Sequence, residues 1–554
     1  MRTAGVVLVL FTAAGGANGQ IQFQEIGKKA GLDFRLRNDA GTKFHQIELM
    51  VGGIAALDFN KDGCIDLFLT NGAAIPSLRK TGSEYYNRLY RNNCDGTFTD
   101  ITGTAGVAGE GYSMAAATAD FDNDGYADIF VAGVNRNLLY RNLGNGRFED
   151  VTVKAGMTGV DARSGKPWSI SAGWFDYDND GWLDLFVSNY VVWDPAAEPV
   201  CGPPENRFYC HPNAYHGLPN QLFHNNRDGT FADVSERSGI ARHIGKGMGV
   251  AFGDIDGDGF TDVFVANDSV RNFLFRNQGE GTFREIGVET GVAYREDGAP
   301  IAGMGADWRD FDNDGRPDLV VSGMINDGFL LFRKAPSGMM FENLGQRTGL
   351  HMGTRQLTGW GLGMYDFDND GWRDLFFAIS HFPRLDRYIG RTAAQPNHIF
   401  RNLDGKRFVD VSATAGPDFQ FPALHHGAAF ADFDNDGRID AAVTTLEGPV
   451  KLFRNVTRGA GHWLAVNLHG TRSNRDGLGA VVTVTLPDGR ALYGTATTSV
   501  GYGSSSEPLV RFGIGAQTEA SRIQIRWPSG TTQELTKVRA DRIVEIEEAG
   551  GVAQ

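Results

Sequence analysis

Seven copies of an acidic loop constrain the fold of this chain more than any other feature. Each copy follows the pattern Asp-x-Asp/Asn-x-Asp-Gly-x-x-Asp, and the copies begin at Asp58, Asp120, Asp176, Asp254, Asp310, Asp366 and Asp432. Oxygen-bearing side chains at alternate positions, with Gly at the sixth, suit a hard cation that takes six to eight oxygen ligands. Solvated acidic turns would not need this repeated spacing, so the sequence predicts about seven calcium ions.

Each loop is expected to offer the same five ligands. These are the side chains of positions 1, 3, 5 and 9 and the backbone carbonyl of position 7. The predicted ligands are Asp58, Asn60, Asp62, Cys64, Asp66; Asp120, Asp122, Asp124, Tyr126, Asp128; Asp176, Asp178, Asp180, Trp182, Asp184; Asp254, Asp256, Asp258, Phe260, Asp262; Asp310, Asp312, Asp314, Arg316, Asp318; Asp366, Asp368, Asp370, Trp372, Asp374; and Asp432, Asp434, Asp436, Arg438, Asp440. The first loop alone has Asn rather than Asp at position 3, namely Asn60.

The loops are not EF-hands. An EF-hand requires a bidentate Glu at position 12 and a helix on each side. Position 12 is apolar in every copy, namely Leu69, Val131, Val187, Val265, Val321, Phe377 and Val443. Short runs rich in β-branched and aromatic residues follow each loop, as in residues 129–132 and 263–266, which favours strands. Each loop is therefore predicted to join two strands.

The spacing of the loops predicts one four-stranded sheet per repeat. Successive first Asp residues are 62, 56, 78, 56, 56 and 66 positions apart, which accommodates four short strands and their turns. Two further strand patterns recur after each loop, first seen as Asn-Arg-Leu-Tyr-Arg-Asn at 87–92 and Phe-Thr-Asp-Ile at 98–101. The fifth repeat is degraded in this part, at 331–334 and 341–344.

The last repeat lacks a fourth strand, and an unmatched fourth-strand pattern stands at residues 23–26. Pairing of this N-terminal strand with the last sheet would close a ring and remove two exposed sheet edges. We therefore predict an all-β chain with a seven-bladed β-propeller over residues 20–456. Residues 457–549 alternate apolar and polar positions, as in 481–486 and 522–527, and predict a small β-sandwich-like domain.

The net charge of −15 reflects the acidic loops. Seven Ca²⁺ ions would add 14 positive charges and bring the chain close to neutrality. An acidic chain of this kind does not suit nucleic acid, whose binding proteins present basic patches.

The two ends of the chain and its cysteines indicate an extracellular or periplasmic location. Residues 1–19 read as a secretory signal, with basic Arg2 and a short apolar run, and residues 550–554 as a tail. No segment is long and apolar enough to span a membrane. Cys201 and Cys210 are predicted to form a disulfide, whereas Cys64 and Cys94 could be either a disulfide or two buried thiols.

These residues resemble a known family. The acidic loops, with Gly-rich strands before them such as 247–252, resemble the FG-GAP repeats of integrin α-chain propellers. Residues 462–468, 476–480, 501–503, 512–515 and 527–530 resemble the ASPIC/UnbV domain. The whole chain is similar to the cartilage acidic protein family, and its lack of a Cys-dense EGF-like module resembles the shorter bacterial members. The resemblance implies a secreted calcium-binding propeller followed by an ASPIC/UnbV domain.

The sequence offers no catalytic constellation. The Gly-Tyr-Gly-Ser-Ser-Ser run at 501–506 is not the Gly-x-Ser-x-Gly turn of a serine nucleophile. Six residues are expected to share the face opposite the calcium loops, because they precede first strands or follow second strands. These possible ligand-face residues are His45, Trp193, His243, His381, His425 and His426.

We therefore expect a secreted, non-catalytic binding or adhesion module that contacts an extracellular protein or glycan through its calcium-free face. Two alternatives stay open. An extracellular polysaccharide hydrolase or lyase would need catalytic side chains converging on the axis. A lectin-like propeller would need aromatic platforms in several blades, for which Trp168, Trp193 and Trp360 form a partial set.

Overall fold

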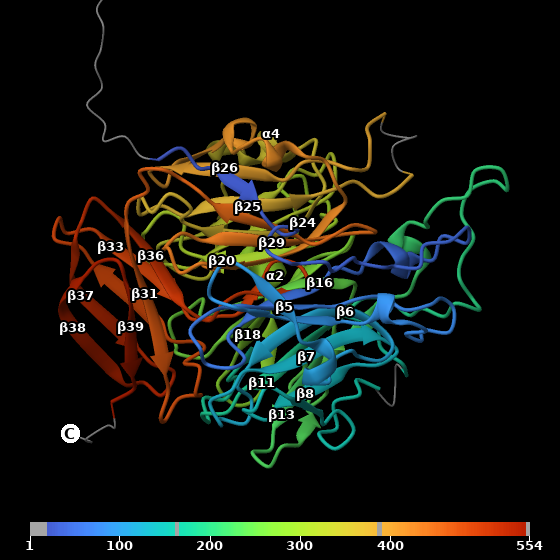
Figure 1. Ribbon diagram of the computed structural model, residues 1–554, viewed down its shortest axis with the longest axis horizontal. Coiled ribbons are helices and arrows are strands. Elements are labelled where there is room, and N and C mark those ends of the chain that lie inside the picture. Colours follow the sequence, from blue (N-terminus) through green and yellow to red (C-terminus); the bar gives the residue numbers. More distant parts are fainter. Residues whose placement is uncertain (1–18, 161–164, 385–389, 550–554) are drawn as a thin grey trace, which may run out of the picture.

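The computed structural model describes residues 19–160, 165–384 and 390–549, and this part of the chain is all-β (Figure 1). The predicted tail and nearly all of the predicted signal lie outside the described residues. Helices are short, and the α-helices are α1 (Thr102–Ala105), α2 (Gly287–Thr290), α3 (Gly345–Thr348) and α4 (Leu350–Thr354).

Each of the seven repeats contributes a four-stranded antiparallel arrangement within the described residues, consistent with propeller-like blades. In repeat order the strands are β2 (Ile54–Leu57), β3 (Asp66–Leu69), β4 (Arg88–Asn92), β5 (Phe98–Asp100); β6 (Tyr112–Ala119), β7 (Asp128–Val134), β8 (Leu138–Asn142), β9 (Phe148–Asp150); β10 (Ser169–Phe175), β11 (Asp184–Asn189), β13 (Gln221–Asn225), β14 (Phe231–Asp233); β16 (Gly247–Gly253), β17 (Asp262–Asn267), β18 (Phe273–Asn277), β19 (Phe283–Glu285); β20 (Ala306–Arg309), β21 (Asp318–Val321), β22 (Leu330–Lys334), β23 (Phe341–Asn343); β24 (Gly359–Tyr365), β25 (Asp374–Ile379), β26 (His398–Leu403), β27 (Arg407–Asp410); and β28 (His425–Ala431), β29 (Asp440–Thr445), β30 (Lys451–Asn455), β1 (Phe23–Glu25).

The acidic loops join the first and second strands of each repeat, as predicted. The second strand always begins at the position-9 Asp, for example Asp128 in β7. First and second strands are buried along nearly their whole length, because both of their faces pack against neighbouring sheets. This two-sided burial explains why the runs after the loops are continuously apolar rather than alternating.

The N-terminal strand pairs with the last repeat, as the sequence predicts. β1 runs antiparallel to β30, with Phe23 opposite Asn455 and Glu25 opposite Phe453. The Phe23 ring stacks on Phe419 at 5.3 Å between centroids and meets Phe367 edge-on at 5.6 Å. The pairing therefore joins the N-terminal segment to the last repeat with both backbone and aromatic contacts.

The C-terminal region forms two further sheets beside the repeats (red in Figure 1). One contains β36 (Val510–Gly515), β31 (His462–His469) and β39 (Arg542–Glu547), and the other contains β33 (Ala491–Thr495), β32 (Val481–Thr485), β37 (Glu519–Arg526) and β38 (Thr532–Arg539). Trp527 is 1% exposed in their shared core.

A hairpin from this C-terminal region inserts among the first strands of the repeats. Its strands are β34 (Ser499–Val500) and β35 (Ser504–Ser505), and together they contact the first strand of every repeat. β35 pairs with β2, and Gly501 exchanges two backbone hydrogen bonds with Ala306 of β20, at 2.8 and 3.2 Å. Gly501 has φ +73°, and a Cβ there would lie 2.6 Å from the Leu362 carbonyl oxygen. The 501–506 run is thus a packing element rather than a nucleophile.

We expect Tyr502→Ala to lower the melting temperature by several degrees. Tyr502 is 1% exposed, donates a hydrogen bond to the Met50 carbonyl, and packs edge-on against Trp360 at 5.3 Å. Removing a buried aromatic ring costs about 3–5 kcal/mol. Thermal unfolding monitored by circular dichroism is the measurement, and Tyr86→Ala, at a half-buried tyrosine, is the matched control. Equal melting temperatures for the two variants would contradict a packing role for the hairpin.

Candidate functional site

The acidic loops are pre-shaped by their own backbone. In the second loop, Asn123 at position 4 and Gly125 at position 6 both adopt left-handed conformations, with φ +56° and +88°. The Asp120 carboxylate accepts hydrogen bonds from the backbone N–H groups of Asp124 (3.0 Å) and Gly125 (2.6 Å). Residues with positive φ at these two positions turn the side chains of positions 1, 3 and 5 toward one another.

The position-9 carboxylate is fixed by the strands rather than by the loop. Asp128 is fully buried and accepts hydrogen bonds from the backbone N–H of Phe121 (3.1 Å) and of Asn142 (2.7 Å). Equivalent pairs of bonds hold Asp66, Asp184, Asp262, Asp318, Asp374 and Asp440. This Asp therefore both orders the sheet and presents oxygen to the loop.

The position-3 carboxylates carry the clearest signal for a cation. The Oδ1 atoms of Asp178, Asp312, Asp368 and Asp434 are buried and have no hydrogen-bond partner. A buried carboxylate oxygen without a partner is costly unless a cation or a donor satisfies it. The same oxygen is unsatisfied in four separate repeats, so the donor set fits a divalent metal ion.

The carboxylates also crowd one another. Oxygens of Asp120, Asp122 and Asp128 lie within 4.8 Å of one another, and the fourth loop brings its positions 1, 3 and 9 together in the same way. Burial, followed by the neighbouring Asp476 carboxylate, raises the pKa of Asp120 to about 8. Burial and then the Asp184 carboxylate raise the pKa of Asp176 to about 8. A bound cation would relieve this repulsion.

Arginines next to the loops were not anticipated from the sequence. Arg141 contacts both Asp122 and Asp124 of its loop, and Arg276 contacts Asp256 (2.5 Å) and Asp258 (3.4 Å). The arginine precedes the Asn that ends the third strand, and His224 takes its place in the third repeat, 3.2 Å from Asp184. The recurring Arg-Asn ending of the third strand was the available signal.

Two sets of asparagines link neighbouring repeats, and these were also missed. The loop asparagines occupy position 4 and donate to the carbonyl of the next loop's Gly, as Asn123 does to Gly181 at 3.0 Å. The strand-end asparagines close the third strand and donate to the preceding loop, as Asn225 does to Phe121 at 2.9 Å. The same two bonds connect the last repeat with the first: Asn435 to the Gly63 carbonyl at 3.1 Å, and Asn92 to the Phe433 carbonyl at 2.8 Å.

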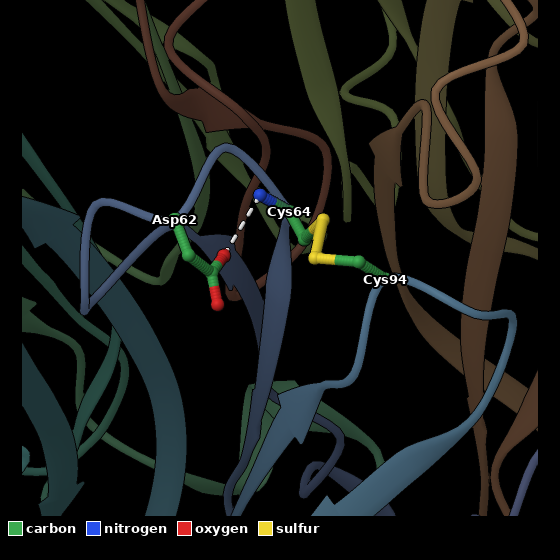
Figure 2. Close-up of side chains that lie close together, drawn as sticks. All are labelled: Asp62, Cys64 and Cys94. Atoms are coloured by element: carbon green, nitrogen blue, oxygen red, sulfur yellow. Dashed lines mark hydrogen bonds between the residues drawn. A yellow bond between two sulfur atoms is a disulfide. The ribbon is translucent and has the colours of Figure 1, made fainter.

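The first loop has a disulfide that the sequence left open. Figure 2 shows Cys64, at position 7, bonded to Cys94 in the turn after the third strand, with Cα atoms 5.7 Å apart. Asp62 accepts a hydrogen bond from the Cys64 backbone N–H at 3.0 Å. The disulfide ties this loop, which alone has Asn60 at position 3, to the outer part of its sheet.

The Cys201–Cys210 disulfide is present as predicted, and the insertion that carries it is anchored by a residue that sequence reasoning missed. Glu198 accepts hydrogen bonds from the Trp193 indole and the Tyr215 hydroxyl, and lies 3.1 Å from His45 Nδ1. His45 and Trp193 are 5% and 8% exposed. These two predicted ligand-face residues meet, but as a buried anchor for the insertion.

The other predicted ligand-face residues do not form a common surface. His381, His425 and His426 are at most 1% exposed, and the His426 ring stacks on Trp360 at 4.0 Å. His243 packs against Phe273 and Phe275, toward the outside of its sheet. These buried histidines fill the core, so they offer no exposed side chain to a ligand.

Burial lowers the pKa of His426 to about 3. Because its pKa in the unfolded chain is about 6.5, the stability that this neutral ring contributes is present above pH 6.5 and is lost as pH falls toward 3. We expect His426→Phe, which keeps the stacked ring, to become more stable relative to wild type as the pH falls. The free energy of unfolding of the variant minus that of wild type should rise by about 2–3 kcal/mol from pH 7.5 to pH 4.5. Urea unfolding at the two pH values measures this gain. The same stability difference between His426→Phe and wild type at both pH values would contradict the predicted effect of burial. His462→Phe, at an exposed histidine, is the control.

The face opposite the loops contains a cavity of about 270 Å³. Its walls come from the beginnings of first strands and the segments before them, from segments after second strands, and from the disulfide-bonded insertion. They include Met50, Met248, Asp268 and Phe382. The walls are mostly apolar. Its lining includes two buried acceptors: the Oε1 atom of Gln46, without a partner, and the Asp268 carboxylate, which accepts hydrogen bonds from Tyr190 (2.6 Å) and Ser269 (2.9 Å). We call this the insertion pocket.

The chain matches two protein families. The FG-GAP-like repeat family matches residues 58–131, 120–187, 209–265, 254–321 and 366–443, and the ASPIC and UnbV family matches residues 470–553. Cartilage acidic protein 1 of Xenopus tropicalis is 26% identical over 322 residues, which are 57% of this chain and 47% of that protein. The human protein is 26% identical over 324 residues, 57% of this chain and 46% of that protein. The chain spans about half the length of these curated relatives.

Two solved structures align with the chain at low sequence identity. A lectin of Agrocybe aegerita that recognises non-reducing terminal N-acetylglucosamine has 17% identity and a TM-score of 0.40, covering 72% of this chain and 86% of its own. The rhamnogalacturonan lyase YesW has 13% identity and a TM-score of 0.38, covering 73% of this chain and 71% of its own. Among the described residues, the helices are all too short or too polar to cross a bilayer.

Proposed function

The chain belongs to the cartilage acidic protein family, with FG-GAP repeats followed by an ASPIC/UnbV domain, and from this premise we propose a secreted, calcium-stabilised propeller that binds a partner without catalysis. The partner would be an extracellular protein or glycan. The observation that carries the proposal is the insertion pocket, an apolar cavity with two buried acceptors on the face opposite the acidic loops.

Calcium would be held by positions 1, 3, 5, 7 and 9 of each loop. When bound, the ion supplies positive charge that neutralises the converging carboxylates. The unsatisfied Oδ1 atoms at position 3 support this assignment, and their recurrence supports occupancy of several loops. The loops would then act as fixed joints, and binding would be left to the opposite face.

The proposed architecture is a seven-bladed ring over residues 20–456, closed by β1, with residues 457–549 as a second domain. The asparagine bonds from Asn435 and Asn92, which join the last and first repeats, support closure. In such a ring the 498–506 hairpin would fill the central channel from the loop side. The insertion pocket would then be a blind pocket suited to holding a ligand rather than passing one through.

The lectin-like alternative has lost its sequence support. Trp168, Trp193 and Trp360, the partial set of aromatic platforms, are 1%, 8% and 0% exposed. Buried tryptophans cannot stack against a glycan at the surface. A glycan could still enter the insertion pocket, but its recognition would depend on that pocket.

We expect replacement of residues 194–216 by a short Gly-Ser linker to abolish partner binding while the ring stays folded. The segment supplies Phe208 and Tyr209 to the pocket wall, and it contains Glu198, which anchors the insertion. Screening the purified protein against extracellular proteins and glycan arrays would identify the partner. The affinity for that partner and the melting temperature would then be measured separately for each variant. Val200→Ser, at a residue 68% exposed in the same insertion, is the control. Unchanged affinity of the linker variant would place binding elsewhere, such as the C-terminal domain.

A further inference from the structure

The junction between the fourth and fifth repeats lacks both asparagine bonds that connect the other repeats. Position 4 of the fourth loop is Gly257, which has no side chain to reach the next loop. In the third strand of the fifth repeat, Lys334 occupies the position that Asn holds in the other six repeats. Each remaining junction in the described chain keeps at least the strand-end bond, including the first, where Asn142 donates to the Phe59 carbonyl at 2.8 Å.

A cavity of about 280 Å³ lies at this same junction. It is lined by the fourth loop from Asp254 to Gly257, by Gly315 and Lys334 of the fifth repeat, and by Tyr493 and Arg526 of the C-terminal domain. Residues from three parts of the chain therefore enclose a space where two hydrogen bonds are missing. We call it the junction cavity.

Lys334 brings a buried ammonium group into the junction cavity without an acidic partner. The residue is 8% exposed, and Nζ donates one hydrogen bond, to the Gly338 carbonyl at 3.2 Å. The nearby carboxylates are engaged elsewhere, since Asp254 pairs with Arg526 at 3.1 Å and Asp256 with Arg276 at 2.5 Å. Within the described ranges, the Lys334 ammonium has no carboxylate within 4 Å. A buried charge is costly unless an opposite charge or further hydrogen bonds compensate it.

Arg526 places a second cation at the rim. Its guanidinium contacts Asp254 through one nitrogen and its side chain is 45% exposed, so other N–H donors stay available. Guanidinium groups bind carboxylates and other oxyanions through paired donors. The ring of Tyr493, beside Gly315, supplies an apolar wall of the kind that sugar rings contact.

We propose that the junction cavity binds a small oxyanion, namely the carboxylate of an acidic sugar or of an organic acid of similar size. The Lys334 ammonium and the Arg526 guanidinium hold the carboxylate, and the ring or chain that bears it lies against Tyr493. The residues that break the repeat pattern here, Gly257 and Lys334, leave the space open and supply the charge. This site is separate from the insertion pocket and lies on the loop side of the sheets.

The test is isothermal titration calorimetry of the calcium-loaded full chain with sodium galacturonate, with neutral galactose and with sodium sulfate. We expect saturable binding of galacturonate, competition by sulfate, and no binding of galactose. Lys334→Asn, which installs the residue used by the other six repeats, should weaken galacturonate binding at least tenfold. Arg526→Gln, at a partly exposed position, provides a second binding variant that does not depend on the core.

Lys406→Asn, at an exposed lysine of the sixth repeat outside the cavity, is the control and should bind galacturonate as wild type does. Gly257→Asn tests the other residue that keeps the cavity open. Gly257 has φ +77°, the loop asparagines of other repeats have φ near +56°, and a Cβ at Gly257 would meet nothing within 4 Å. This variant should restore the other missing bond, raise the melting temperature by about 1–3 °C, and weaken galacturonate binding, because its side chain occupies space that Gly257 leaves open. Wild-type protein that binds neither anion, or Lys334→Asn that binds as tightly as wild type, would overturn the proposal.

Discussion

Removing calcium will lower the melting temperature of the protein by about 10 °C or more. A ligand that binds only the folded state, present at 100 times its Kd, stabilises that state by about 2.7 kcal/mol per site. The sequence provides seven such loops. Without bound calcium, buried carboxylates such as those of Asp120 and Asp128 lie close together with no positive charge between them. Their mutual repulsion opposes folding.

Differential scanning fluorimetry in excess calcium and in excess chelator measures this effect at one pH. Readdition of calcium should restore the original melting temperature, and magnesium should restore it poorly, because Mg²⁺ demands a smaller octahedral site. A melting curve indifferent to the chelator would mean that the arginines and backbone bonds alone stabilise the loops.

Deleting residues 20–31 will cause aggregation or marked destabilisation. The deletion removes β1, leaves the β30 edge unpaired, and takes the Phe23 ring out of its stack with Phe419. An exposed strand edge is a template for association with other chains. Phe23 is only 2% exposed, so its loss also leaves a cavity between the last two repeats.

Size-exclusion chromatography with light scattering, together with thermal unfolding, measures the outcome. Phe23→Ala separates packing from pairing, since it removes the ring and keeps the strand. A truncated protein that stays monomeric with unchanged stability would show that β1 does not close the repeat array.

The sequence predicts the repeats well because their determinants are local. The acidic loop fixes its own turn through the Gly at position 6, and the apolar runs beside it can only be buried strands. The unmatched pattern at 23–26 likewise predicts its own partner, because only one repeat lacks a fourth strand. Local chemistry repeated seven times leaves little freedom in the assignment.

The candidate site was harder to predict, because burial depends on tertiary packing. His425 and His426 were expected before the first strand of the last repeat, on its surface, yet they begin β28 in the core. The anchoring role of Glu198 depends on His45, 153 positions away in sequence. The hairpin around Tyr502 reaches every repeat, and no local pattern shows this. The loop and strand-end asparagines were visible as repeated letters, but their partners lie in neighbouring repeats.

Counting the calcium ions bound to each chain by native mass spectrometry tests the central claim most directly. We expect seven ions for the wild-type chain, with the first loop, which has Asn60 at position 3, losing its ion most readily. We also expect one ion fewer for Asp254→Ala, with the other loops still occupied. A wild-type chain that carries no calcium, or an Asp254→Ala chain that carries as many ions as wild type, would contradict the claim.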